Sequence, residues 1–207
     1  MNLPDVIKTI EEIRELSTVI TKSNFIAQVY PVLSENQVKE FLRTAKKKYY
    51  DASHHCYAFK LADGLTRYSD AGEPNGAAGI RILNAIDHFN LSNQLIIVSR
   101  IFGGVKLGVG PLGKAYYEST SKLINESEIE TKKLFKKAVI STNYEQINLI
   151  QRILFNHHSI VTESKYQESI ELFCLLISSE IESISNKISE IGKGTIRLKI
   201  LSETVYK

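Results

Sequence analysis

Cysteine is scarce in this sequence of 207 residues, and long hydrophobic runs are absent. The two cysteines, Cys56 and Cys174, lie far apart in segments that read as strands, which argues against a disulfide framework or a cysteine-rich zinc site. No stretch reaches the roughly 18 apolar residues that a transmembrane helix needs, and the N-terminus has no apolar signal core. We therefore expect a cytoplasmic protein that is neither secreted nor membrane-bound.

An excess of charge of one sign is also missing. The sequence has 26 Lys and Arg residues against 23 Asp and Glu residues, a net charge of +3. This balance does not by itself indicate a nucleic-acid-binding protein, so a basic binding face would have to be local. One candidate is the face of a predicted helix that carries Lys39, Arg43, Lys46 and Lys47, although such faces more often serve solubility.

Glycine, in contrast, is concentrated in one part of the chain. Eight of the 11 glycines lie between Tyr68 and Tyr117. Glycine contributes no side-chain packing and costs backbone entropy, so this concentration indicates unusual dihedral angles or the close approach of another group to the backbone. We therefore look for the functional site in this stretch.

Hydrophobic periodicity predicts strands and helices in alternation over residues 1–133, which we expect to form an N-terminal α/β domain. The expected elements are two antiparallel strands in 6–32, a helix from Ser34 with a capping box, a strand in 51–61, a helix in 77–89, a central strand at 95–98, a helix from 111 to 125 and a strand at 129–133. The lysine-rich segment 132–137 is the expected domain boundary.

Residues 134–207 show a second pattern. A strand at 138–142, a helix at 144–155, a strand pair at 159–166 and 169–177, a helix at 181–191 and a strand at 195–201 give the order βαββαβ. This order predicts a ferredoxin-like C-terminal domain. The whole chain is therefore expected to belong to the α+β class.

The loop that contains Gly103, Gly104, Gly108 and Gly110 can be interpreted as an anion nest. Glycines let backbone N–H groups converge, and a helix N-terminus follows the loop. Positive charge would come from Arg100, Lys106 and Lys114, and Phe102 or Tyr57 could offer a stacking surface. The loop has neither a Walker signature nor an acidic residue at dinucleotide-binding spacing, and a tight packing corner remains an alternative.

A second candidate site consists of His54, Asp70 and Glu73. If the strands bring them together, these side chains could carry out acid–base hydrolysis or hold a divalent metal. Carboxylates that precede a helix more often act as caps, however, and no pair of residues has metal-ligand spacing. We therefore assign no metal and no cofactor to the sequence.

Three segments in the N-terminal domain carry a resemblance to a known family. They are Ala52–Ala58, Ser69–Gly79 and Arg100–Gly110, and in this order and spacing the chain resembles the YigZ/IMPACT family in its bacterial two-domain form. The second domain matches by its pattern alone. The resemblance implies an N-terminal domain of the split βαβ type found in ribosomal proteins and in the fourth domain of elongation factor G, followed by a ferredoxin-like domain similar to that factor's fifth.

For function, the resemblance implies a link to translation. Eukaryotic IMPACT restrains a starvation-responsive kinase of the initiation machinery, but that role draws on an additional N-terminal domain that this sequence does not contain, so we do not expect kinase control to carry over. Our leading hypothesis is a non-enzymatic, RNA- or ribosome-associated regulator of translation, with a translation factor as a further partner. The alternatives are a metal-dependent hydrolase or other small-molecule enzyme that uses His54, Asp70 and Glu73, and a protein-interaction scaffold.

Overall fold

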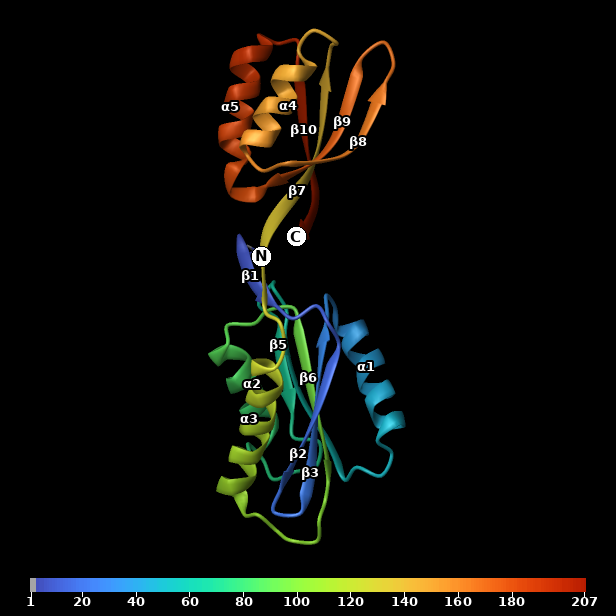
Figure 1. The fold of residues 1–207 in the computed structure, drawn as a ribbon, viewed down its shortest axis with the longest axis vertical. Coiled ribbons are helices and arrows are strands. Elements are labelled where there is room, and N and C mark those ends of the chain that lie inside the picture. The colour runs from blue at the N-terminus through green and yellow to red at the C-terminus, as the bar shows by residue number, and fades with distance from the viewer. Residues whose placement is uncertain (1–2) are drawn as a thin grey trace. The chain divides into compact units, whose positions relative to one another are not determined.

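The computed structural model describes residues 3–207, which form two compact units (Figure 1). Unit 1 contains residues 7–131, and unit 2 contains residues 4–6 together with 132–207. Within the described residues the chain forms two five-stranded sheets and five α-helices, which confirms the α+β class. None of these helices is long and apolar enough to cross a membrane.

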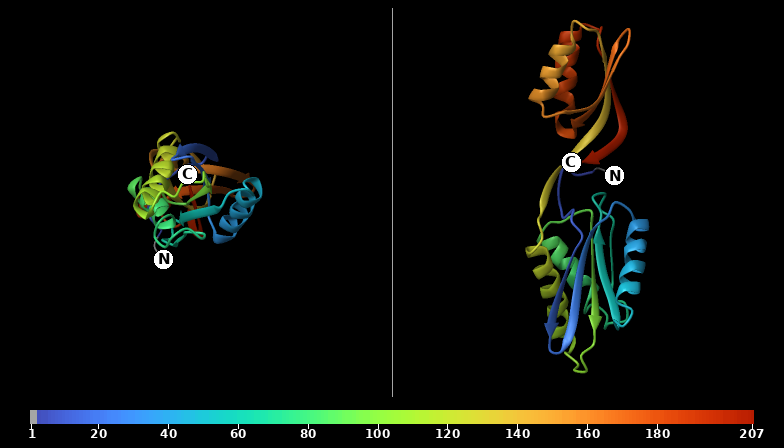
Figure 2. Two further views of the ribbon diagram at one scale, coloured as in Figure 1. Left: turned by 90° about the horizontal axis from the view of Figure 1, so that it is seen from below. Right: turned by 45° about the vertical axis from the view of Figure 1, so that its right-hand side comes forward.

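Unit 1 is an antiparallel sheet with helices on both faces (Figures 1 and 2). The strand order is β2-β3-β6-β4-β5, with bounds Arg14–Ile20, Ser23–Pro31, Gln94–Ile101, His54–Lys60 and Thr66–Ser69. Helices α2 (Gly79–His88) and α3 (Val109–Asn125) pack on one face, and α1 (Glu35–Lys48) packs on the other. Because β6 lies between two strands and two helical layers, every residue from Gln94 to Arg100 is buried, as the apolar run at 95–98 predicted.

Helix α1 begins where the sequence predicted it. The Ser34 hydroxyl accepts a hydrogen bond from the Gln37 N–H, and the Gln37 side chain accepts one from the Leu33 N–H. These bonds satisfy amide groups that the first helical turn leaves unpaired. Val38 and Ala45 of this helix are buried against the sheet.

Unit 2 has the element order expected for residues 134–207. Its elements are β7 (Glu130–Thr142), α4 (Ile147–Asn156), β8 (Ile160–Tyr166), β9 (Ile170–Ile177), α5 (Ile181–Gly192) and β10 (Arg197–Tyr206). Strand β7 pairs in antiparallel fashion with β9 and with β10, and β8 pairs with β9. Helices α4 and α5 cover one face of this sheet, and side chains such as Ile153, Ile184 and Ile188 form the core between the layers.

Three elements differ from the prediction. The segment 6–32 holds three strands rather than two, because β1 (Val6–Thr9) pairs with β7 in the second sheet. Residues 129–142, predicted as two strands around a lysine-rich linker, form the single strand β7, since Leu134 and Phe135 in their middle are buried. Strand β5 was not predicted, because its four residues carry little apolar signal.

Candidate functional site

Strand β4 divides its side chains between the two cores of unit 1. Cys56 and Ala58 pack in the core that includes α2 and α3, whereas Tyr57 and Phe59 pack in the core beneath α1. Such an alternation follows from the period of two residues in a strand. His54, at the start of the strand, lies on the same side as Cys56 and therefore near the loop that leads to α2.

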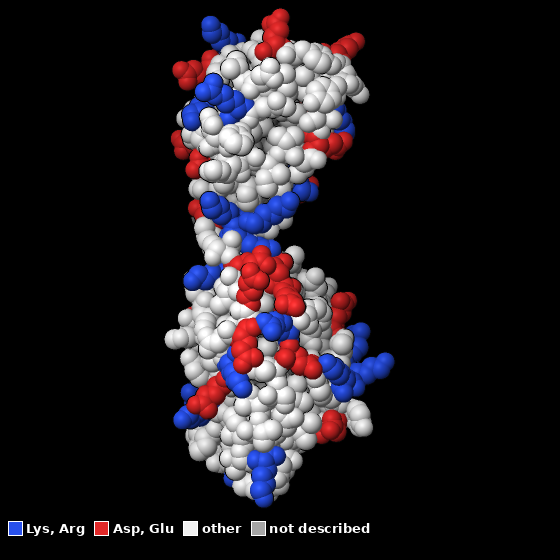
Figure 3. Space-filling model, viewed as in Figure 1, with Lys and Arg blue, Asp and Glu red and all other residues white. Residues whose placement is uncertain are grey.

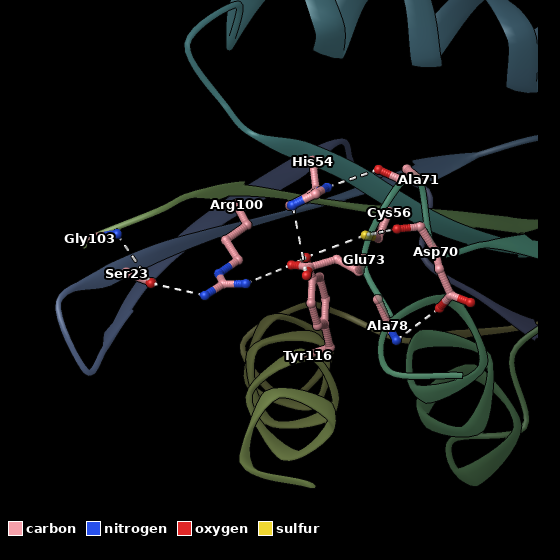
Figure 4. A network of polar contacts seen from close by, with 10 residues as sticks. All are labelled: Ser23, His54, Cys56, Asp70, Ala71, Glu73, Ala78, Arg100, Gly103 and Tyr116. Atoms are coloured by element: carbon pink, nitrogen blue, oxygen red, sulfur yellow. Dashed lines mark hydrogen bonds and ion pairs between the residues drawn. The ribbon is translucent and has the colours of Figure 1, made fainter. Parts of the chain in front are cut away.

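A buried carboxylate, Glu73, is the centre of a polar network between β4, β6 and α3 (Figure 4). Its Oε1 accepts hydrogen bonds from Arg100 Nη1 and from the Tyr116 hydroxyl, each at 2.8 Å. The side chains of Glu73 and Arg100 are 4% and 6% exposed. Two opposite charges so far from water must compensate each other, so this ion pair fixes the loop that carries Glu73 onto the sheet.

Arg100 is further enclosed by its neighbours. Its Nη2 donates to the Ser23 hydroxyl at 3.3 Å, and its guanidinium carbon lies 5.4 Å from the ring centroids of both Phe25 and Phe102. The sequence predicted Arg100 as a phosphate contact. The structure instead commits its charge to Glu73, so the positive charge available to a ligand at the glycine loop must come from elsewhere.

Two other members of the network are not ionised at neutral pH. Burial raises the pKa of the Cys56 thiol to about 12, and burial also raises the pKa of Tyr116. The Cys56 thiol donates to the Asp70 carbonyl at 2.9 Å and contacts the Tyr116 hydroxyl at 3.3 Å. Both groups therefore act as hydrogen-bond donors inside the core, and neither has the character of a nucleophile.

Asp70 caps the segment that enters α2. Its two carboxylate oxygens accept the backbone N–H groups of Gly76, Ala78 and Gly79 at 2.8 to 2.9 Å. Burial alone would raise the pKa of Asp70, but these three hydrogen bonds together hold it below its usual value. The structure thus brings His54 and Glu73 together and directs Asp70 to the helix, as the capping interpretation expected.

Replacing Asp70 with alanine is expected to lower the free energy of unfolding at pH 7 by about 1–2 kcal/mol, because three amide donors lose their acceptor. Since the pKa of Asp70 is lower in the folded state, its stabilisation is complete above the unfolded pKa and is lost as the pH falls through the folded value. Urea unfolding of both proteins from pH 7 to pH 3 measures this difference.

The control variant is Glu118→Ala, because Glu118 forms an exposed pair with Lys114 one helical turn away. It should change stability by less than about 0.5 kcal/mol at any of these pH values. An equal loss in both variants, or a loss for Asp70→Ala that persists unchanged at pH 3, would contradict the capping role.

His54 is held in one tautomer by the loop. Its Nδ1 lies 2.9 Å from the Ala71 carbonyl oxygen, which can only accept, so Nδ1 carries the proton. The other ring nitrogen, Nε2, lies 3.8 Å from Glu73 Oε2. This distance is longer than a hydrogen bond, so the two groups face each other without a direct bond when the imidazole is neutral.

A cavity of about 480 Å³ opens beside these groups. Its polar lining includes His54, Glu73, Arg100 and Lys106, and its apolar walls come from Pro74, Phe102, Leu107, Val109 and Leu112. The N-terminus of α3 forms part of the wall: Gly108 is the N-cap residue, no side chain among the described residues caps it, and its first turn holds no acidic residue. This helix end therefore presents the free N–H groups of Val109 and Gly110 and a positive dipole, while Pro111 in the same turn has no N–H.

Glycine is required at different positions of the loop for different structural reasons. A Cβ at Gly103 would lie 1.9 Å from the Lys22 carbonyl oxygen, so this glycine allows the loop to pack against the β2–β3 turn. Gly104 and Gly108 have positive φ angles of 82° and 81°. Gly110 has neither constraint, because a Cβ there would meet no described atom within 4 Å apart from its chain neighbours and its own helix backbone. It does precede Pro111 inside the helix, where the proline ring disfavours a residue with a Cβ. Tight packing, the alternative to anion binding, thus explains Gly103, and the following proline favours glycine at position 110.

The two predicted lysines lie on different sides of the start of α3. Lys106 lines the cavity described above, whereas Lys114 lines a neighbouring hollow with Gly110, Gly113 and Arg81. Lys114 is exposed and lies 3.5 Å from Glu118. Phe102, the predicted stacking residue, is 45% exposed and lines the cavity.

Sequence reasoning missed Ser23 and Tyr116 as members of the site. Tyr116 occupies an apolar position of α3, and Ser23 lies in a hairpin far away in the sequence, so no local pattern marked either one. Within residues 3–207, no group of three or more His, Cys, Asp and Glu side chains is placed to hold a metal ion.

Comparisons with known proteins identify the family. Residues 21–124 match the family model described as Impact N-terminal domain, and residues 140–195 match Domain of unknown function (DUF1949). The IMPACT family member YvyE of Bacillus subtilis is 31% identical and aligns over 92% of this chain and 89% of its own length. YigZ of Escherichia coli is 26% identical over 89% of this chain and 92% of its own.

Two comparisons with more distant proteins agree with this family assignment. Protein IMPACT of Rattus norvegicus is 37% identical over 42% of this chain but only 29% of its own length. A solved structure described as a hypothetical protein superposes with a TM-score of 0.68 at 24% identity and covers 97% of this chain and 100% of its own, which shows a shared fold. On the family matches and the full-length similarity to YvyE, this chain belongs to the IMPACT family.

Proposed function

We propose that this protein is a non-enzymatic, RNA- or ribosome-associated regulator of translation that binds the phosphate backbone at the start of α3. The observation that carries the proposal is the uncapped N-terminus of this 17-residue helix, which opens into a cavity beside Lys106. Helix N-termini with free amides bind phosphate groups, because the amides and the helix dipole both favour an anion.

The charges that line the cavity favour the binding of a polyanion. Glu73, the only acidic residue in its lining, is paired with Arg100, so the two charges offset each other and Lys106 leaves the site positive. The loop between β6 and α3 lies at the same end of unit 1 as the β2–β3 turn (Figure 1). In Figure 3, the tip of this end shows a basic side chain and no acidic one.

Phe102 adds a surface for a base. Its ring is 45% exposed beside the lysine, and single-stranded RNA is bound by aromatic stacking combined with contacts to phosphate. The proposed phosphate-contacting set therefore includes Lys106, Lys114 and the loop backbone, while Arg100 acts through its pairing with Glu73.

The family relation supports the translational setting of the proposal. Full-length similarity to bacterial IMPACT family members supports a family-level role. We further propose that the protein has a stress-linked function in the cytoplasm and that a translation factor is one of its partners. We also propose that residues 1–133 and 134–207 are separate domains, the first of the type found in ribosomal proteins and in the fourth domain of elongation factor G. The sheet order β10-β7-β9-β8 supports a ferredoxin-like assignment for the second.

Co-sedimentation with ribosomes and with single-stranded RNA at low and high salt tests the proposal. The wild type should migrate with RNA at low salt and be released at high salt. In the Lys106→Ala/Lys114→Ala variant, the slope of log affinity against log salt should fall by about 0.7 for each lysine that contacts phosphate.

A matched control is Lys39→Ala/Arg43→Ala, which removes two basic side chains from α1. This control should bind like the wild type if the helix face serves solubility. Absence of the wild type from every RNA-containing fraction would overturn the proposal and favour the hydrolase alternative at His54 and Glu73. Binding that is insensitive to salt would favour a protein-interaction scaffold.

A further inference from the structure

One oxygen of the buried carboxylate at the cavity lacks a hydrogen-bond donor. Glu73 Oε1 accepts two hydrogen bonds, but Oε2 meets among the described residues only His54 Nε2 at 3.8 Å. The Glu73 side chain is 4% exposed. Because Glu73 lines the cavity, Oε2 is an acceptor that no donor of the described residues satisfies and that a donor on a ligand could reach.

His54 supplies a second acceptor at the same place. Because Nδ1 donates to the Ala71 carbonyl, the neutral ring directs the lone pair of Nε2 toward Glu73 Oε2 (Figure 4). N–H···O and N–H···N bonds span about 3 Å, so a single nitrogen with two hydrogens can reach both acceptors across the 3.8 Å gap. The pair is thus suited to an uncharged amino group.

The rest of the cavity fits a planar ring next to a phosphate. Its volume of about 480 Å³ lies in the range of small-molecule sites, and Pro74, Phe102 and Leu112 give it apolar walls. The α3 N-terminus and Lys106 lie in the same lining. A ligand that combines an amino group, an aromatic ring and a phosphate satisfies all three parts of the site.

We infer that the cavity accepts one unpaired nucleobase that carries an exocyclic amino group, with the amino group between Glu73 Oε2 and His54 Nε2 and the adjoining phosphate at the start of α3. This inference rests on the proposed function and adds base selectivity to it. Cytosine, adenine and guanine carry such an amino group. Uracil presents a carbonyl oxygen where cytosine has its amino group, and this oxygen would face two acceptors.

Binding of the full-length protein to the single-stranded RNA hexamers rC6 and rU6 tests the inference, with fluorescence anisotropy at one fixed salt concentration as the measurement. The two probes have the same backbone charge and differ at the exchanged amino and carbonyl groups. Wild type should bind rC6 about tenfold more tightly than rU6. Equal affinity for the two hexamers would overturn the inference while leaving phosphate binding, and with it the proposed function, intact.

Two variants locate the selectivity. Glu73→Gln can keep its carbonyl oxygen on Arg100 and Tyr116 and present its amide N–H to the cavity, so it should reverse the preference toward rU6. His54→Ala removes one of the two acceptors without touching Arg100 and should reduce the preference for rC6 severalfold. His54→Ala also decides the question if Glu73→Gln does not fold, as circular dichroism would show.

The outcomes separate the two proposals. If neither hexamer binds at any salt concentration, the proposed function itself fails. If both bind with the salt dependence assigned to Lys106, but the preference is absent or is unchanged in His54→Ala, only the base-selective cavity is contradicted.

Discussion

Replacing Arg100 with alanine is expected to lower the free energy of unfolding by about 3–5 kcal/mol. The substitution leaves the Glu73 carboxylate, which is 4% exposed, without the cation 2.8 Å away. It also removes packing from the rings of Phe25 and Phe102 and a donor from Ser23. Urea unfolding monitored by circular dichroism measures the loss.

The matched control is Lys48→Ala, which breaks an ion pair of similar length, 2.7 Å, with Glu15. These two side chains are 53% and 37% exposed, so water already solvates both charges and the expected change is below about 1 kcal/mol. The double variant Arg100→Met/Glu73→Gln should recover part of the loss of Arg100→Ala, because it removes both charges together. A loss for Arg100→Ala no greater than that of the control would refute the buried ion pair.

Arg100 is therefore unsuitable as a probe of RNA binding. A variant without Arg100 would lose RNA binding through damage to the fold even if the guanidinium never touches phosphate. Lys106 and Lys114 line cavities at the surface and can be removed without exposing a buried charge. A loss of binding in their variants therefore reports on the interface.

Gly103→Ala is expected to destabilise the protein by about 3 kcal/mol. The new Cβ would lie 1.9 Å from the carbonyl oxygen of Lys22 and 2.1 Å from its carbonyl carbon, both of them backbone atoms. Neither atom can move without displacing the β2–β3 turn, where Thr21 and Lys22 already have positive φ angles. Thermal and urea unfolding of the purified variant give the change.

Gly110→Ala is the natural comparison, because it adds the same methyl group in the first turn of α3, where no described atom other than its chain neighbours and its own helix backbone lies within 4 Å. It should change the free energy of unfolding by less than about 1 kcal/mol, because the helix propensity of alanine is offset by the contact of its Cβ with the ring of Pro111. If it leaves stability nearly unchanged and still weakens RNA binding, the open backbone at this position serves the ligand. A destabilisation equal to that of Gly103→Ala would show that our account of the two glycines is wrong.

The sequence predicted those parts of the fold that depend on short-range periodicity. The apolar run at 95–98 predicted a central strand, and the segment 51–61 predicted the strand whose residues Cys56 and Tyr57 pack in opposite cores. The Ser34 cap is equally local, because donor and acceptor are three residues apart. Family membership also followed from local motifs, since the matching segments Ala52–Ala58, Ser69–Gly79 and Arg100–Gly110 are short and ordered.

Such short-range patterns do not predict which distant strands pair with each other. Strand β1 joins the second sheet, and β7 runs without a break through a segment whose lysines read as a linker. A strand's partners depend on which edge is free in the folded protein, and composition does not record that choice. The lysines of β7 flank Leu134 and Phe135, which become buried only once the sheet has formed.

For the site, the sequence by itself determined which residues are special, and the tertiary structure decided what each one does. Arg100, Glu73, Asp70 and His54 were all singled out. The roles of Arg100, Glu73 and His54 depend on partners from 17 to 77 residues away in the chain, whereas Asp70 caps amides only 6 to 9 residues away. Glu73 neutralises Arg100, Asp70 caps a helix, and His54 faces a cavity, because folding brings Ser23, Tyr116 and the start of α3 to the same end of the sheet. The charge that an arginine offers to a ligand is set by its burial and its counter-ion, and only the folded chain fixes both.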